Sequence, residues 1–229
     1  ANTLGGNAQL RQQTQVRYQF NAEYRIPNDV GVLNAELFYA DHEDVIDRVY
    51  VSTSESNLNS ANGNIGDGAE YGLDLSASLR MKMINLPNLL INTTLSLQDS
   101  NVTDPFLGIE RRFRFYQRGR FTTTFQHFIP SMRVNWGMQY FDRIDGGMFQ
   151  YEVNDIEFVV GEPRLNFFAE YVSSRSVTYR FDFGNITDSS QCRRRTRFVG
   201  RTSANILEEI EWRCTDGGNE FSLSVNGTF

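Results

Sequence analysis

Strict alternation of apolar and polar residues is the feature that most constrains the fold of this chain. In "VRYQFNAEYRI", residues 16–26, an apolar residue occupies every second position, and segments 71–83, 89–98, 132–140 and 177–183 repeat the pattern. A period of two places apolar side chains on one face of a β-strand and polar side chains on the other. No helical period of useful length occurs, so the sequence predicts an all-β protein.

About eleven segments have the character of strands, with a typical length of roughly ten residues. They are 14–26, 32–50, 70–82, 88–98, 112–128, 132–142, 164–173, 177–184, 193–200, 204–213 and 219–229. A tilted strand of this length crosses a bilayer. Charged residues crowd 193–200 and 204–213, which alternate least well. The basic run "QCRRRTR" of the first is expected to pair with the acidic run "EEIE" of the second across neighbouring strands.

The connections between these segments alternate between short and long. The short ones are 27–31, 85–87, 130–131, 173–175 and 200–203, and the long ones are 51–69, 99–110 and 143–163, with shorter members of the long set at 185–191 and 214–219. Tight turns on one rim and long loops on the other are typical of outer-membrane β-barrels. The sequence therefore predicts one antiparallel up-and-down meander of about eleven strands.

Four stretches form an ordered set of loose motifs. They are "LNAELFYADHEDVIDRV" (33–49), "DGAEYGLDLSASL" (67–79), "NLPNLLINTTLSLQDSNVTDPFLG" (85–108) and "EFSLSVNGTF" (220–229). Together they resemble the C-terminal half of the barrel of a TonB-dependent outer-membrane receptor. The resemblance spans nearly the full chain and implies a plugged barrel of about 22 strands. Residues 1–229 are thus expected to be the C-terminal part of this barrel domain, with the plug and the N-terminal strands absent, and the start at Ala1 without a methionine fits that expectation.

The resemblance implies an outer-membrane active-uptake receptor of a Gram-negative bacterium, which binds and imports a scarce ligand such as a metal chelate or siderophore. The expected partners are outer-membrane lipid, the small-molecule or chelate ligand, and an inner-membrane coupling protein of the TonB type that acts through the absent plug. If the segment is isolated, its open sheet edges are also expected to allow self-association. The net charge of −6 argues against a nucleic-acid partner.

A soluble β-rich ligand- or carbohydrate-binding domain without a transport role is the alternative. Alternation does not distinguish a face turned to lipid from one turned to a protein core. No catalytic motif, phosphate-binding glycine loop or metal-ligand pattern occurs in the sequence. We therefore expect neither an enzyme nor a cofactor or metal site.

Eight residues are candidates for ligand contact. Four arginines alternate in "RRFRFYQRGRF" and are expected on the polar, lumen-lining face of segment 112–128, and the other four candidates lie in the longest loop, 143–163. The candidates are Arg112, Arg114, Arg118, Arg120, Arg143, Phe149, Tyr151 and Phe158. A ladder of guanidinium groups suits anionic ligands or acidic groups of a plug. A solvated face that keeps the lumen wet explains the same pattern.

Two further features concern assembly. Cys192 and Cys214 are expected at the loop-rim ends of neighbouring strands, where a disulfide would pin the base of a loop; two unrelated free thiols are the alternative. Phe229, the last residue, resembles the terminal aromatic by which outer-membrane barrels are recognised for assembly. The alternative for Phe229 is a buried phenylalanine at the end of a soluble β-domain.

Overall fold

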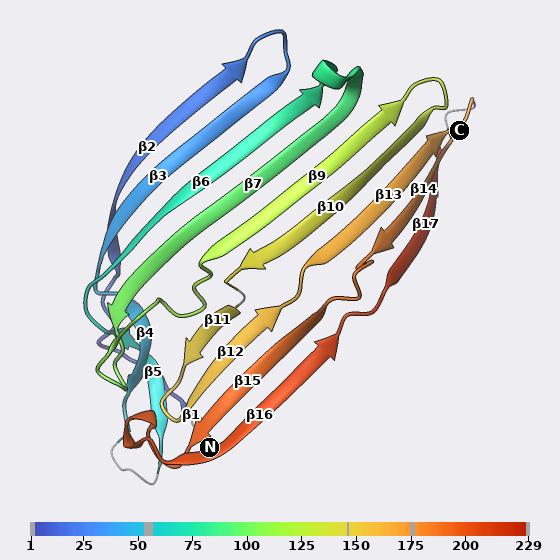
Figure 1. Cartoon of the computed structure of the whole chain (residues 1–229). Helices are drawn as coiled ribbons and strands as arrows, with labels where there is room; N and C mark the ends of the chain where they lie inside the picture. The colour runs from blue at the N-terminus through green and yellow to red at the C-terminus, as the bar shows by residue number, and fades with distance from the viewer. Residues whose placement is uncertain (1–2, 53–56, 146, 175–176, 228–229) are drawn as a thin grey trace.

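The computed structural model describes residues 3–52, 57–145, 147–174 and 177–227 (Figure 1). This part of the chain is all-β, as the alternation predicts, and its only helices are two short 3₁₀ turns, η1 (Lys82–Ile84) and η2 (Thr202–Ala204). Every strand pair is antiparallel except β1 with β5. No helix of the described residues is long and apolar enough to cross a membrane. Phe229 lies outside the described residues, so its predicted role remains a prediction.

The largest sheet is a single curved layer that runs across Figure 1. Its strands follow one another in the order β2, β3, β6, β7, β9, β10, β13, β14 and β17, and the short β8 also pairs with β7. Their bounds are β2 Thr14–Ile26, β3 Gly31–Glu43, β6 Gly68–Met81, β7 Leu86–Thr103, β8 Glu110–Arg111, β9 Gly119–Ile129, β10 Val134–Ile144, β13 Arg164–Val172, β14 Thr178–Gly184 and β17 Glu220–Asn226. Each strand hydrogen-bonds to its neighbour in this order, so the sheet is built as a meander.

A four-stranded sheet extends the large sheet at its lower right in Figure 1. It contains β11 (Gly147–Tyr151), β12 (Asp155–Gly161), β15 (Ser190–Phe198) and β16 (Leu207–Asp216), in that order. Four strands of the large sheet, β10, β13, β14 and β17, follow one another in the corresponding order, so that each is next in sequence to one strand of the four-stranded sheet. Each strand of the four-stranded sheet therefore continues a strand of the large sheet across an interruption, and we call each such pair of strands an arm. In these four arms β10 leads into β11, β12 into β13, β14 into β15 and β16 into β17.

A three-stranded sheet forms a second extension at the lower left, with β1 (Thr3–Leu4), β5 (Asn59–Asn64) and β4 (Ile46–Tyr50) in that order. Here β4 continues β3 and β5 leads into β6. The backbone hydrogen bonds Val45 N to Gly66 O and Ile65 N to Val45 O, 2.8 and 2.9 Å, bridge this interruption. Counted as arms, the described chain has nine in the meander, namely β2, β3–β4, β5–β6, β7, β9, β10–β11, β12–β13, β14–β15 and β16–β17.

The expected eleven strands and the expected loops are thus corrected in several places. Segments 177–184 and 193–200 belong to one arm, and 204–213 and the described part of 219–229 belong to the next. The expected loops 185–191 and 214–219 are interruptions inside arms, and 143–163 is mostly the β11–β12 hairpin with the strand ends beside it. The expected short turn 200–203 connects β15 to β16 at the loop end of the molecule. Residues 112–118 are not a strand, because β9 begins only at Gly119.

Asn185 holds the interruption between β14 and β15 together. It is fully buried, and its side-chain amide donates to Gly218 O (2.8 Å) and Ser189 O, while its Oδ1 accepts from Ser189 N (2.9 Å). Its backbone is left-handed, with φ 52°, a conformation that asparagine tolerates better than most residues. Asn185 therefore supplies hydrogen-bond partners to main-chain groups that have no partner in a neighbouring strand at this interruption.

Connections at the upper end of the arms are all short, as expected, whereas those at the lower end range from residues 152–154 between β11 and β12 to residues 104–118 between β7 and β9. The β2–β3, β6–β7, β9–β10 and β13–β14 connections are short and lie at the upper end in Figure 1. The connections β4–β5, β7–β9, β11–β12 and β15–β16 lie at the lower end, which we call the loop end.

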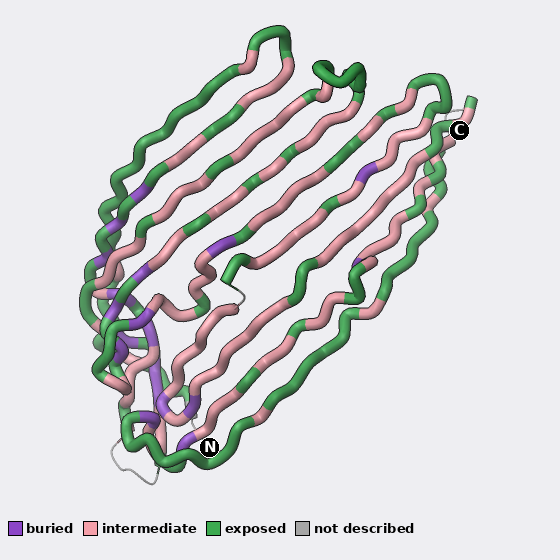
Figure 2. The backbone as a smooth tube through the Cα atoms, viewed as in Figure 1, coloured by how far each residue is buried: buried purple, intermediate pink, exposed green. Residues whose placement is uncertain are grey.

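The two faces of the large sheet differ in polarity, and neither carries a second layer in the described chain (Figure 1). Large apolar side chains on one face are exposed, including Phe20 at 67% and Leu223 at 75%. Buried residues gather near the loop end in Figure 2. The few buried apolar residues of the described chain include Ala40, Ala61, Val102 and Val153.

Cys192 and Cys214 form a disulfide, which confirms the predicted pairing. The two residues face each other directly in the β15–β16 register, with 4.0 Å between their Cα atoms. They lie close to the interruptions of their arms and not at the loop end, because 185–191 and 214–219 are not loops. The disulfide therefore joins two arms partway along their length.

We expect Asn185→Ala to lower the free energy of unfolding by about 2–3 kcal/mol, because it leaves several buried main-chain groups without partners. Asn205→Ala is the matched control. Asn205 has the same φ of 52° but is exposed and makes no side-chain hydrogen bond within the described residues, so the control should cost at most about 1 kcal/mol. Denaturant unfolding of the chain in detergent, followed by tryptophan fluorescence, measures both; equal losses would contradict the role given to the Asn185 amide.

Candidate ligand-binding site at the loop end

A buried charge cluster lies where β4, residues 104–118 and the β11–β12 hairpin meet. Arg111 Nε donates to Asp104 Oδ2 and Arg111 Nη2 to Asp47 Oδ2, both at 2.6 Å. The side chains of Arg111 and Asp47 are 3% exposed, and that of Asp104 is 0% exposed. Arg111 Nη1 donates to Arg112 O, and the guanidinium lies 4.3 Å from the ring centroid of Tyr151. Burial raises the pKa of the Tyr151 phenol, so this ring stays neutral under Arg111.

Asp104 also builds the turn that brings Arg111 into place. Its Oδ1 accepts from the backbone N–H groups of Phe106 and Leu107, a hydrogen-bonding habit of aspartate in turns. Its own N–H donates to Ile109 O at 2.7 Å, and Gly108 at φ 67° closes the turn. Because one carboxylate serves both the turn and Arg111, the conformation of the turn is coupled to the ion pair.

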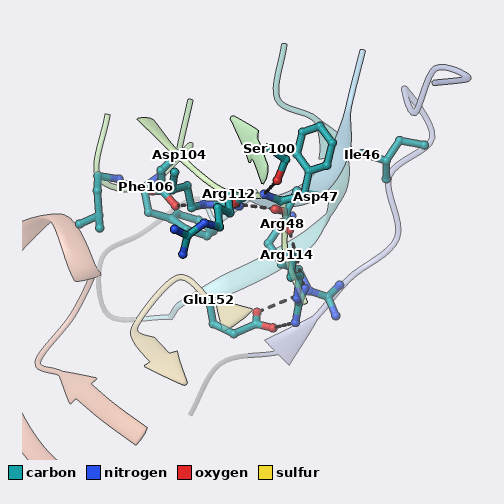
Figure 3. A network of polar contacts seen from close by, with 12 residues as sticks. Ile46, Asp47, Arg48, Ser100, Asp104, Phe106, Arg112, Arg114 and Glu152 are labelled. Carbon is teal, nitrogen blue, oxygen red and sulfur yellow. Dashed lines mark hydrogen bonds and ion pairs between the residues drawn. The ribbon is translucent and has the colours of Figure 1, made fainter. Parts of the chain in front are cut away.

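A second set of ion pairs surrounds this cluster. Figure 3 shows Glu152 facing Arg48 and Arg114, from β4 and from residues 104–118. Arg48 Nε lies 3.4 Å from Glu152 Oε2, and Arg114 forms a short hydrogen bond to Glu152 Oε1. Arg114 Nη1 also lies 3.9 Å from Asp47 Oδ1. Three separate segments of the chain therefore contribute charged side chains that form ion pairs at one place.

The predicted arginine ladder does not form. Three of its members lie in the irregular segment 112–118, where Phe115 has a positive φ of 58°. Arg112 Nε pairs with Asp99 at 2.8 Å, and Arg118 pairs with Asp145 at 2.9 Å and with Asp99 at 3.1 Å. Arg120, the fourth member, stands apart on β9, where it lines a separate polar hollow beside Asp74 and Glu36.

Tyr116 is a fixed hydrogen-bond donor in the same segment. Its hydroxyl donates to Asp99 O at 3.3 Å and lies 3.5 Å from Glu70 Oε2. Burial, together with the Glu70 carboxylate, raises the pKa of Tyr116 well above its usual value. The phenol therefore remains protonated throughout the physiological range.

A cavity of about 650 Å³ opens beside the charge cluster; we call it the mouth cavity. It shares Arg48 and Glu152 with the cluster, and its other charged walls come from β12, β15 and the start of β16. The charged lining residues are Arg48, Glu152, Asp155, Glu157, Arg195, Arg197 and Glu208. Both signs of charge alternate around it, so its surface suits polar and zwitterionic solutes.

Asp155 is the most constrained residue of the mouth cavity. It is 2% exposed, and its Oδ2 accepts from Arg195 Nε at 3.1 Å and from Arg195 Nη2. Its Oδ1 has no hydrogen-bond partner, and neither does Asn154 Oδ1 beside it. Buried polar atoms are nearly always paired. The wall thus offers two acceptors that a solute hydroxyl or ammonium group, or water, would satisfy.

The remaining predicted contacts lie in different places. Phe149 and Phe158 face each other across β11 and β12, with ring centroids 4.8 Å apart, and their alternation puts them on the face opposite Glu157. Arg143 lines another cavity, near the interruption of the arms. The structure therefore brings Arg114 and Tyr151 to the charge cluster and leaves Phe149, Phe158, Arg120 and Arg143 outside it.

Sequence reasoning missed Arg48, Asp155 and Glu152 as site residues, because they come from segments with no shared motif. The signal that was available is the pairing of "QCRRRTR" with "EEIE". Arg197 pairs with Glu209, and Arg193 Nη2 lies 3.5 Å from Glu211 Oε1, as predicted. Among the described residues no group of His, Cys, Asp and Glu is arranged to hold a metal ion.

Comparison with known proteins adds no family to these observations. No protein-family model matches the chain. No curated protein matches it either. A functional assignment therefore rests on the geometry of the sheet and of the loop end.

We expect Arg111→Met to destabilise the chain by about 3–5 kcal/mol, because it leaves the buried carboxylates of Asp47 and Asp104 without a counter-charge. Arg118→Met is the matched control at an exposed ion pair, 42% exposed, and should cost less than about 1 kcal/mol. Denaturant unfolding measures both, and limited proteolysis should cut R111M, but not R118M, within residues 104–118. A loss in R111M no larger than in R118M would contradict a structural role for the cluster.

Proposed function

We propose that this chain is the C-terminal barrel segment of an outer-membrane active-uptake receptor, similar to the TonB-dependent receptors. The observation that carries the proposal is the uncovered apolar face of the large sheet. In a soluble monomer the largest apolar patch covers roughly 300–600 Å². Here exposed aromatic and aliphatic side chains continue from Tyr18 and Phe20 on β2 to Phe221 and Leu223 on β17, a face that lipid would cover.

The opposite face of the same strands supports the proposal. Arg17 pairs with Glu36 at 2.8 Å, and Arg180 pairs with Glu170 at 2.8 Å and with Asp182 at 2.6 Å. Such a face is stable only next to water or a polar partner. Polar residues facing a lumen and apolar residues facing lipid are the arrangement of transmembrane barrels.

The asymmetry of the two ends supports a direction for the segment. Short turns are typical of the periplasmic rim and long loops of the extracellular rim. We infer that the loop end, with the charge cluster and the mouth cavity, faces outward and meets the ligand first. A small molecule or metal chelate would be imported from there, with energy from an inner-membrane coupling protein acting through a plug. That coupling rests on the resemblance alone.

The soluble β-rich binding domain remains the second candidate. It requires the apolar side chains of neighbouring strands to meet in a core, as in a sandwich with two layers. The described chain offers no second layer to the face that carries Phe20 and Leu223. Only association with a further sheet would cover this face in water.

A pair of neighbouring substitutions on β6 tests which face meets lipid. Leu75→Arg places a charge on the apolar face and should destabilise the membrane-embedded chain by about 2–4 kcal/mol. Ser76→Arg is the matched control on the polar face, where Glu36 and Asp74 line the same hollow, and should change stability by less than about 1 kcal/mol. Unfolding in phospholipid vesicles measures both.

Fractionation provides the second measurement. The wild-type chain should sediment with membranes and resist extraction with urea or carbonate. A folded, monodisperse monomer in detergent-free buffer, with L75R and S76R equally stable, would favour the soluble binding domain and contradict the proposal.

A further inference from the structure

A cavity of about 330 Å³ lies where β10, β12 and β14 are interrupted; we call it the junction cavity. Its wall includes Arg143, Glu162, Arg164, Ser190, Gln191 and Thr215. A water molecule occupies about 30 Å³ of liquid, so the space holds a small anion together with water. It is separate from the mouth cavity, with which it shares no lining residue.

Arg143 is the unusual residue of this cavity. Its Nη1 is buried and has no hydrogen-bond partner. Among the partly buried arginines of the described chain, Arg143 alone has no hydrogen bond or ion pair. Arginine stays charged at every physiological pH, and a partly buried charge is normally paired. The structure thus holds a guanidinium in place with its binding capacity unused.

The nearest carboxylate is occupied elsewhere. Glu162 lines the cavity, but its Oε2 accepts from Ser190 N at 2.8 Å and from Ser190 Oγ at 3.0 Å. Glu162 makes no ion pair with Arg143 within 4.0 Å in the described chain. Gly161, next to it, leaves room for the guanidinium, since a Cβ at Gly161 would lie 3.4 Å from Arg143 Nη1.

Arg164 adds a second positive charge to the same wall. Its Nε donates to Asn166 Oδ1 at 3.2 Å and its Nη2 lies 3.2 Å from Glu220 Oε2, so one of its two outer nitrogens is engaged in these bonds. The hydroxyl of Thr215 and the amide of Gln191 add polar groups to the lining. Because Glu220 neutralises Arg164, the charge of the lining that lacks an ion-pair partner is that of Arg143.

We propose that the junction cavity is an oxyanion subsite, in which Arg143 binds a carboxylate or phosphate group of a small solute. Arginine presents two parallel N–H groups to such oxygens. That the subsite serves a transported ligand rests on the proposed function, whereas the binding itself does not. A small solute with an oxyanion group is then the ligand class of the segment.

Titration calorimetry of inorganic phosphate and of citrate into the full chain, folded in an uncharged detergent at fixed ionic strength, tests the subsite. Maltose serves as the neutral probe. The wild-type chain should bind at least one of the two anions and not maltose. Arg143→Gln should weaken anion binding by roughly tenfold or more. Arg143→Lys should weaken it less, because lysine keeps the positive charge but lacks the two parallel N–H groups of arginine.

Two further variants separate a local site from general attraction. Arg193→Gln is the matched control: Arg193 is 37% exposed, pairs with Glu157 and Glu211, and does not line the cavity. It should leave anion affinity within roughly twofold. Glu162→Gln should instead tighten binding, because it removes the negative charge beside Arg143 while an amide oxygen still accepts from Ser190.

The outcomes are distinct. Loss in R143Q, no change in R193Q and a gain in E162Q support the subsite. Equal affinity in R143Q and R193Q, or no anion binding by the wild-type chain, overturns it. If the wild-type chain binds anions in detergent but does not enter membranes, the proposed function fails and the subsite stands.

Discussion

Main-chain hydrogen bonds between neighbouring strands hold this structure together, because neither face of the large sheet is covered by a second layer in the described chain. In most globular domains burial of apolar side chains supplies the main driving force. Here that burial is restricted to a small group near the loop end, which includes Ala40, Ala61 and Val153. A ladder of this kind is stable where water does not compete for its N–H and C=O groups, which is the condition inside a bilayer.

The dependence on the ladder explains where polar side chains are buried. Wherever the ladder is interrupted, the released main-chain groups need partners. Asn185 supplies them between β14 and β15, and Asp104 supplies them in the turn after β7. Asp104 then carries a second task as the counter-charge of Arg111. The loop end is therefore ordered by charge pairing where the upper part of the molecule is ordered by strand pairing.

Alternation was sufficient to predict the all-β class and the polarity of the two faces. The connection lengths predicted most of the short turns at one end, but the expected short turn 200–203 lies at the other. Alternation was not sufficient to count strands. "NITDSSQ" and "CTDGGN" contain the residues that form turns, but Asn185 and Gly218 use their left-handed backbones to continue an arm in the same direction. These two interruptions lie side by side in neighbouring arms, so the sequence prediction divided both arms and counted two strands too many. An error of two strands leaves the direction of the last strand unchanged, so that direction was predicted correctly. Spacing alone does not separate a reversal from an interruption.

The site was less predictable than the fold, because its residues are brought together by tertiary contacts. Arg114 and Tyr151 were expected near a ligand, but their immediate partners come from elsewhere: Glu152 from the β11–β12 connection and Arg111 from the turn at Asp104. The arginine ladder failed for a local reason: Phe115 adopts a positive φ, and a strand does not pass through such a residue. Period-two alternation of charges over a short segment is thus weak support for a strand when no partner strand is identified.

The two cavities lie along one face of β12, and their separation places a limit on how they act. Asp155 in the mouth cavity and Gly161 in the junction cavity share a face of β12 and are six residues apart, a distance of roughly 20 Å along a strand. A small solute does not span that distance. The mouth cavity offers unpaired acceptors, and the junction cavity offers an unpaired donor. A solute that carries both hydroxyl groups and an oxyanion would therefore find a different kind of partner in each cavity, and the apolar pair Val159 and Met148 separates the two on that face.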